Sequence, residues 1–351
     1  MENKFRQALE EAYGIRIDIN TYGNGHINDT YITKAHPRYV IQRINHKVFT
    51  DPVGVMDNFA AVTDFLQKKI AAEGGDPTRE TLNLVLTKGG KNHVEVDGNY
   101  FRAYRLVDQS YCYDLPETAD LFCEAGKTFG HFQKLLQDFP ADTLKETIPN
   151  FHNPPDRYRK LRIAIENDVM GRRRDVEDEI AFVEARVNKL SAITDAIREG
   201  TVPLRVTHND TKINNVLFDE KSGKGLCVID LDTVMPGSLL YDFGDAIRAG
   251  ATTGAEDEKN LSKVTFRLDF YRAFREGFLS ELGDCMTEKE VELLPLSAEL
   301  ITLECGMRFL TDHLEGDTYF RIRRPGQNLD RARTQFKLVA DMEKMEDEMR
   351  K

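Results

Sequence analysis

Tryptophan is absent from the 351-residue sequence, and the five cysteines include no Cys-x-x-Cys pair. A thiolate zinc site needs such pairs and a disulfide framework needs an even set, so the odd count indicates a reducing compartment. No window approaches the ~18 apolar residues of a membrane span. The opening residues, MENKFRQALEEAYGI, lack the continuous apolar stretch of a signal peptide. These absences predict a cytoplasmic protein without a membrane partner.

Positive charge is also in short supply. The chain has 48 Lys and Arg against 59 Asp and Glu, a formal net charge of −11. A protein that binds nucleic acid or an anionic membrane needs a dominant positive field, so we expect neither partner. Hydrophobic residues make up 40% of the sequence, which is enough for a large core. At this length we expect two lobes, in a monomer or weak homodimer.

Residues 1–107 predict a small lobe of mixed helix and strand. The run YVIQRI, residues 39–44, is rich in β-branched and aromatic side chains and predicts a strand. Apolar residues recur at helical spacing over residues 52–73, which predicts a helix packed on the sheet. Asp97 and Gly98 separate two β-prone runs, a pattern typical of a hairpin.

Residues 108–351 predict a mostly helical lobe. Apolar residues follow spacings of three and four from Val176 to Ile197, which predicts one unbroken helix that ends at Gly200. The last segment, residues 328–351, has apolar residues on a charged background. We expect it to form a terminal helix docked on this lobe.

The most informative stretch is VTHNDTKINNVLF, residues 206–218, which GLCVIDLDTVMPGSLLYDFGD soon follows. Apolar runs flank the turn KSGKG and predict a hairpin that brings Asp210 near Asp230. Two oxygen ligands and one free carboxylate suit a magnesium ion that arrives with nucleotide phosphates. A lone Asp or Asn more often caps a helix or forms a turn, but the spacing His-x-Asp-x4-Asn with Ile-Asp-x-Asp fixes three roles together.

Three neighbouring residues are candidates for structural support of the site. His208 is expected to be buried and to brace the loop that holds Asp210. Asp242 is expected to brace the same loop from behind. Asp232 stays open between support of the site and direct contact with the metal.

The two motifs resemble those of the aminoglycoside phosphotransferase and choline kinase superfamily. Longer stretches, such as VIDLDTVMPGSLLYDFGDAIRAGA and LECGMRFLTDHLEGDTYF, are similar to the N-acetylhexosamine 1-kinases. The resemblance implies an α+β, bilobal, protein-kinase-like fold, with a β-rich nucleotide-binding lobe at 1–107 and a mostly helical catalytic and sugar-binding lobe at 108–351. It implies ATP and Mg²⁺ as cofactors, and phosphorylation of the 1-hydroxyl of N-acetylglucosamine or N-acetylgalactosamine.

The resemblance also assigns residues to roles. It makes Asp210 the catalytic base, which also contacts the sugar, and makes Asn215 and Asp230 magnesium ligands, with Asp232 as a further candidate. It implies sugar contacts from His26, Arg308 and Tyr319, and nucleotide contacts from Gly23, Gly25, Gln42, Tyr104 and Leu106. Without it, Arg308 is interpreted as a surface salt-bridge residue, Tyr319 as a core aromatic residue and the glycine loop as a hairpin turn.

One departure leaves the phosphate contacts open. Many relatives have a strand lysine that binds the phosphates and pairs with a helix glutamate. Here Gln42 stands near that place, residues 52–72 contain no Glu, and Arg43 is expected on the opposite sheet face. The alternatives are a kinase of the same fold that acts on an amino alcohol, aminoglycoside or homoserine, and a nucleotide-binding pseudokinase. A binding site for a cationic substrate needs several carboxylates or an aromatic box, and the lack of tryptophan disfavours the aromatic box.

Overall fold

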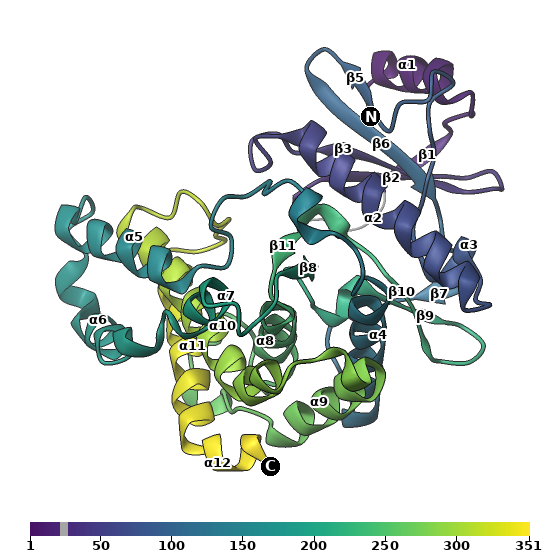
Figure 1. The fold of residues 1–351 in the computed structure, drawn as a ribbon. Helices are drawn as coiled ribbons and strands as arrows, with labels where there is room; N and C mark the ends of the chain where they lie inside the picture. The colour runs from purple at the N-terminus through teal and green to yellow at the C-terminus, as the bar shows by residue number, and fades with distance from the viewer. Residues whose placement is uncertain (22–26) are drawn as a thin grey trace.

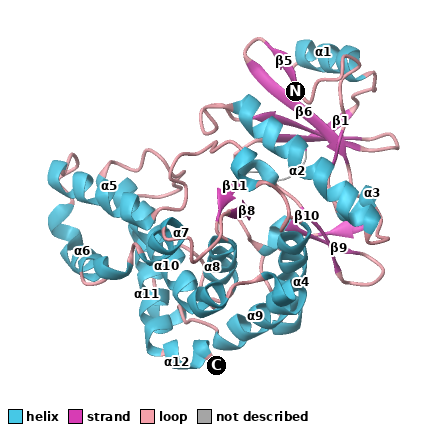
Figure 2. Ribbon diagram, viewed as in Figure 1, coloured by secondary structure: helices cyan, strands magenta, loops and turns pink. Residues whose placement is uncertain are grey.

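An antiparallel six-stranded sheet is the framework of the N-terminal region, in the order β1-β2-β3-β6-β4 with β5 paired to β6. The computed structural model describes residues 1–21 and 27–351. The sheet lies beside a larger helical region, as Figures 1 and 2 show. Its strands are β1 (Ile19–Thr21), β2 (Asp29–Thr33), β3 (Tyr39–Ile44), β4 (Asn83–Leu84), β5 (Val94–Val96) and β6 (Asn99–Arg105).

The strand predicted at 39–44 and the hairpin predicted at Asp97-Gly98 are both confirmed. Asp97 and Gly98 have φ angles of 49° and 70°, the left-handed values that a tight two-residue hairpin turn requires. This hairpin fixes the register of β6. In turn, β6 pairs with β3 so that Gln42 faces Arg102 across the ladder.

Side-chain alternation gives the sheet two buried faces. Ile41 and Phe101 pack with the apolar side of α1 (Asn3–Tyr13) on one face. Arg102 and Tyr104 face α2 (Pro52–Ala72) on the other, where Phe59 contacts both. The helix predicted at 52–73 is confirmed and is followed by the short helix α3 (Pro77–Glu80).

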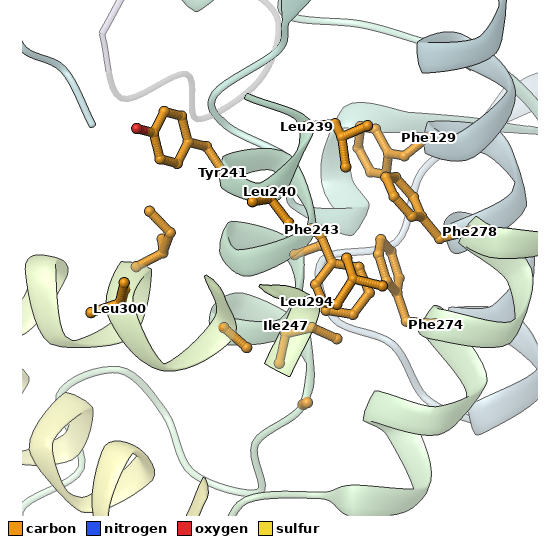
Figure 3. Packing of buried hydrophobic residues seen from close by; sticks show 14 of the residues in the cluster. Phe129, Leu239, Leu240, Tyr241, Phe243, Ile247, Phe274, Phe278, Leu294 and Leu300 are labelled. Carbon is orange, nitrogen blue, oxygen red and sulfur yellow. The ribbon is translucent and has the colours of Figure 1, made fainter. Parts of the chain in front are cut away.

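The helical region is built around α8 (Leu239–Gly250), which is buried along most of its length. Figure 3 shows Phe243 of α8 packed with Phe274 and Phe278. The surrounding helices are α4 (Ala119–Leu135), α9 (Leu268–Leu282) and α10 (Glu288–Leu314). The remaining α-helices are α5 (Pro154–Asn167), α6 (Glu177–Glu184), α7 (Ala192–Arg198), α11 (Gln327–Lys344) and α12 (Glu346–Arg350).

Two small sheets and several 3₁₀ turns lie where the regions meet or between the helices. One sheet has the order β10-β9-β7 and the other pairs β11 with β8. Their strands are β7 (Ser110–Tyr111), β8 (Arg205–Thr207), β9 (Val216–Asp219), β10 (Gly225–Val228) and β11 (Met235–Gly237). The 3₁₀ turns are η1 (Ala141–Thr143), η2 (Arg173–Val176), η3 (Val187–Lys189), η4 (Ile213–Asn215), η5 (Leu231–Thr233), η6 (Leu261–Lys263) and η7 (Gly283–Cys285).

The prediction of one unbroken helix over 176–197 is wrong, because the segment breaks into α6, η3 and α7. At the break, Arg186 and Lys189 turn toward Glu343 of α11 and form ion pairs with it. Val183 before the break and Leu190 and Ile193 after it are buried, so the apolar periodicity indicated which residues are buried and not whether the helix is continuous. The end at Gly200 is confirmed, since its φ is 74°.

The terminal helix is confirmed as docked, but it is interrupted at Met345 between α11 and α12. In the described part of the chain, no helix has the length and apolar character to span a membrane.

Candidate active site

The loop between β8 and η4 holds Asp210, and Asp242 of α8 fixes its shape. The Asp242 carboxylate accepts hydrogen bonds from the backbone N–H groups of His208 at 2.9 Å and Asn209 at 2.7 Å. It also accepts one from the Gln133 side chain at 2.5 Å. Asn209 has a φ of 65°, a left-handed conformation that this double anchor sustains. The predicted brace is confirmed.

His208 connects this loop to the end of β10. Its side chain is buried between Phe129 and Phe132, as predicted. Nε2 lies 2.8 Å from the Ile229 carbonyl oxygen, and Nδ1 lies 3.2 Å from the Asp210 backbone nitrogen. A neutral ring protonated on Nε2 satisfies both contacts, because Nε2 then donates and Nδ1 accepts. His208 therefore positions Asp210 relative to the residue after Ile229, which is Asp230.

The Asp210 side chain reaches solvent and contacts two neighbours. Its carboxylate lies 2.7 Å from Lys212 Nζ and accepts a hydrogen bond from Asn215 Nδ2 at 3.2 Å. Surrounding protein tends to raise its pKa, but the Lys212 charge and hydrogen bond outweigh this and lower the pKa to about 2. Asp210 is therefore ionised at neutral pH. It can accept and orient a hydroxyl hydrogen, but it is too weak a base to remove the proton fully.

Asp230 and Asn215 supply oxygens suited to a magnesium ion. Asn215 Nδ2 donates to the Asp210 backbone oxygen at 2.8 Å, which leaves its amide oxygen for other contacts. Surrounding protein, then the negative charges of Asp232 and Asp210, raise the pKa of Asp230 to about 6. A bound cation would relieve this repulsion, so the residues fit a divalent metal. Among the described residues, no group of three His, Cys, Asp or Glu side chains is placed to hold a metal ion by itself.

Asp232 is nearly fully buried and is held by residues of the sheet region. One carboxylate oxygen contacts the guanidinium of Arg102, and the other accepts a hydrogen bond from Asn28 Nδ2. These contacts favour support of the site over direct metal ligation. They also connect the sheet to the segment that follows Asp230.

The predicted nucleotide side holds a cation that the sequence analysis missed. Gln42 Oε1 accepts hydrogen bonds from Arg102 Nε at 3.0 Å and Nη2 at 2.6 Å, and Gln42 Nε2 donates to Thr30 Oγ1. Arg43 projects from the opposite face, as expected, and forms a solvent-accessible ion pair with Asp29. The sequence offered one usable signal for Arg102, which is a basic residue between Phe101 and Ala103 in a predicted β-prone run. Its proximity to Gln42 depended on strand order, which the sequence did not give.

One of the residues expected to contact the nucleotide, Leu106, is partly engaged in the sheet. The Leu106 backbone N–H donates to the Arg38 carbonyl oxygen at 2.9 Å, so it is not free to pair with adenine. The β3–β6 ladder continues one residue past the end of β6, which the strand pattern did not show. The Tyr104 ring lies against Phe59 with centroids 5.9 Å apart. Gly23, Gly25 and His26 lie outside the described residues.

Arg308 and Tyr319 come together beside one aromatic ring. The Arg308 guanidinium lies 5.5 Å from the Phe151 ring and 5.4 Å from the Phe320 ring. It forms no ion pair with a described residue, so the salt-bridge interpretation is not supported. Tyr319 packs edge-on against Phe320 but is 65% exposed, so its interpretation as a core aromatic residue is wrong.

A buried polar pair joins this cluster to the loop of Asp210. His152, next to Phe151, has Nδ1 3.0 Å from Glu304 Oε1 and Nε2 3.3 Å from the Asn209 carbonyl oxygen. Glu304 lies one turn before Arg308 on α10. Sequence reasoning missed both residues, although a Glu inside the apolar run ITLECGM was a usable signal. His152 and Glu304 thus connect the aromatic cluster beside Arg308 and Tyr319 to the backbone of the predicted catalytic loop.

Comparison with known proteins identifies the fold and the family of the chain. The chain is similar to a microcompartment-associated aminopropanol kinase (15% identity, TM-score 0.60, 99% of this chain and 98% of that one). It is similar to an aminoglycoside phosphotransferase from Alicyclobacillus acidocaldarius (13%, 0.60, 98% and 96%) and to a choline kinase from Cryptosporidium parvum Iowa II (12%, 0.56, 95% and 90%). These likenesses confirm the expected protein-kinase-like fold. The model of the phosphotransferase enzyme family matches residues 18–278, and the chain therefore belongs to that family.

Proposed function

We propose that this phosphotransferase is an ATP-dependent kinase that phosphorylates the 1-hydroxyl of an N-acetylhexosamine. The observation that carries the proposal is the polar cluster of His152, Glu304, Arg308 and Tyr319 next to the Asp210 loop. A neutral sugar has hydroxyls and one amide, so its site needs donors and acceptors in fixed directions. The side chains of this cluster supply both hydrogen-bond donors and acceptors.

The charges of the cluster disfavour a cationic substrate. Glu304 is already paired with His152, and Arg308 adds a positive charge on the same helix. Glu304 Oε2 has no hydrogen-bond partner among the described residues, but an ammonium group that approached it would be repelled by the Arg308 guanidinium one turn away. Amino alcohols and aminoglycosides are therefore the weaker candidates for this chain.

In the proposed reaction, the sugar hydroxyl oxygen attacks the γ-phosphorus, ADP leaves and the hydroxyl proton is released to solvent. Asp210 accepts a hydrogen bond from the hydroxyl and aims it in line with the leaving group. Lys212 holds the Asp210 carboxylate in its ionised form, and Asp242 and His208 hold the loop in place. Because the transition state is loose, this positioning outweighs deprotonation. Asp230 and Asn215 would hold Mg²⁺, which neutralises phosphate charge when bound.

The test is ADP release with a panel of acceptors at equal concentration. The panel contains N-acetylglucosamine, N-acetylgalactosamine, glucose, galactose, ethanolamine, choline, homoserine and an aminoglycoside, and the Asp210→Asn variant is the control for contaminating kinases. We expect turnover only with the 2-acetamido sugars and a loss of about 10²–10⁴-fold in kcat in the variant. Preference for an amino alcohol or a plain hexose would reject the substrate class. If no acceptor in the panel leads to ADP release, the result would favour a pseudokinase.

A further inference from the structure

Arg102 is a charged side chain with an unusual environment. It lies in β6 at 1% exposure and is the largest of the fully buried side chains. Its guanidinium stacks 4.3 Å from the centre of the Phe59 ring, contacts Asp232 and donates two hydrogen bonds to Gln42. Burying a cation costs free energy unless all its donors are satisfied, so the arrangement calls for an explanation.

The hydrogen bonds of Arg102 are incomplete. Nη1 is buried and has no hydrogen-bond partner among the described residues, while Nε and Nη2 are both engaged by Gln42. The planar guanidinium fixes the direction of the free N–H groups once its other edge is held. A buried, unpaired donor of a charged group is one of the costliest defects a fold can retain. An anionic ligand placed against Nη1 would remove that cost.

Its position selects the anion. Asp232, which Arg102 contacts, is two residues after Asp230, and the carboxylates of Asp210 and Asp230 face the same site. The carboxylates of Asp210 and Asp230 repel a polyphosphate, so a cation on the sheet side of the site would favour its binding. Gln42 stands on β3 where many relatives have a lysine, and Arg102 lies directly opposite on β6, so both side chains project from the same face.

From these contacts we infer that Arg102 binds the phosphates of the nucleotide, and that it supplies from β6 the charge that β3 lacks. The inference rests on the proposed function only in its use of a nucleotide. Gln42 acts as the positioning residue, because its amide oxygen holds the guanidinium edge-on. Phe59 of α2 supports the guanidinium from one face, since a cation stacks favourably on an aromatic ring.

The experiment measures binding of ADP and of adenosine, without a sugar, at constant Mg²⁺ by calorimetry. Arg102→Gln should raise the Kd of ADP about 10- to 100-fold and leave the Kd of adenosine within threefold. Arg43→Gln is the matched control, because this neighbouring arginine lies on the opposite face, and its Kd values should not change. The double variant Gln42→Lys/Arg102→Gln returns a cation to the β3 position and should recover at least tenfold of the lost ADP affinity.

Equal loss of ADP and adenosine affinity in Arg102→Gln would overturn the inference, because it would show a change of site shape and not a lost phosphate contact. Unchanged ADP affinity, or no recovery in the double variant, would overturn it too. All three outcomes leave the sugar kinase proposal standing, whereas a wild-type protein that binds no ADP rejects both. If Arg102→Gln does not fold, the Nε–Hε NMR signal of Arg102 in the wild type decides. This signal should shift when ADP binds and should not shift with adenosine. The absence of an ADP-specific shift would overturn the inference.

Discussion

At the scale of single residues, charge neighbours decide what Asp210 can do. Lys212 keeps the pKa of Asp210 at about 2, while Asp230 has a pKa raised to about 6 by surrounding protein and by Asp232 and Asp210. The pKa values of these two carboxyl groups are thus shifted in opposite directions, because Asp210 has a cation beside it whereas Asp230 is subject to burial and to two neighbouring anions. Asp210 suits the orientation of a hydroxyl, and Asp230 gains most from a metal ion.

Arg308 gives a prediction at the same scale. Arg308→Ala should lower kcat/KM for the sugar about 5- to 150-fold, because it strands polar hydroxyls in a partly desolvated site at ~1–3 kcal/mol. The KM for ATP should stay unchanged. Arg159→Ala is the control, since Arg159 forms an exposed pair with Asp156 on α5. Steady-state kinetics in both substrates measures the effect, and a defect confined to ATP would place Arg308 on the nucleotide.

The residues that the sequence predicted well belong to short local motifs. Asp210 and Asn215 directly precede the β9–β10 hairpin and Asp230 directly follows it, so their spacing alone placed them together. Arg102 and Glu304 were missed because their partners are 60 and 152 residues away in the chain. Such contacts depend on strand order and helix packing, which periodicity does not contain.

At the scale of elements, close helix packing depends on glycine. A Cβ atom at Gly277 of α9 would lie 2.0 Å from the Cys123 carbonyl oxygen of α4, and one at Gly126 of α4 would lie 2.4 Å from the Phe274 carbonyl oxygen of α9. Real Cβ atoms do not approach backbone oxygens so closely, so a side chain here forces the helices apart. The sequence predicted a mostly helical lobe after residue 107 but gave no sign of how closely α4 and α9 would approach each other.

The Gly277→Ala variant tests this packing. It should lower the free energy of unfolding by about 1–3 kcal/mol or more, because the added methyl group overpacks a backbone contact. Chemical denaturation monitored by circular dichroism measures the change. Gly89→Ala is the control, since a Cβ there meets only Thr87 Oγ1 at 3.8 Å, and it should stay within about 0.5 kcal/mol of the wild type. Equal stability of the two variants would contradict the close approach of α4 and α9.

At the scale of the whole molecule, the sheet and the helical region are joined through polar contacts behind the site. Asp232 contacts Arg102 and Asn28 of the sheet region. Asn58 of α2 donates to the Val234 carbonyl oxygen at 3.0 Å and to the Lys145 carbonyl oxygen at 2.8 Å. The sequence predicted the two regions separately, but it could not predict the contacts between them. These contacts involve isolated polar residues, which a sequence does not distinguish from ordinary surface residues. The position of α2 is therefore coupled to the segment that holds Asp230.

A second junction of the whole molecule is electrostatic and gives a prediction for pH. Glu343 of α11 accepts hydrogen bonds from Arg186 at 2.9 and 2.6 Å and from Lys189 at 2.7 Å, in the break between α6 and α7. Partial burial tends to raise the pKa of Glu343, but these hydrogen bonds outweigh it and hold the pKa below 4.5. A carboxyl group with a lowered folded-state pKa stabilises the fold above its unfolded pKa, and the contribution disappears as the pH falls through the folded value.

Glu343→Gln should therefore lower Tm at pH 7, and its difference from the wild type should shrink steadily as the pH falls below about 4.5, the usual pKa of the group. Glu220→Gln is the control, because Glu220 forms no ion pair among the described residues, and its Tm should follow the wild type at every pH. Thermal unfolding of the three proteins between pH 7 and pH 3 gives the comparison. A difference that stays constant across this range would mean that Glu343 stabilises the junction by its shape and not by its charge.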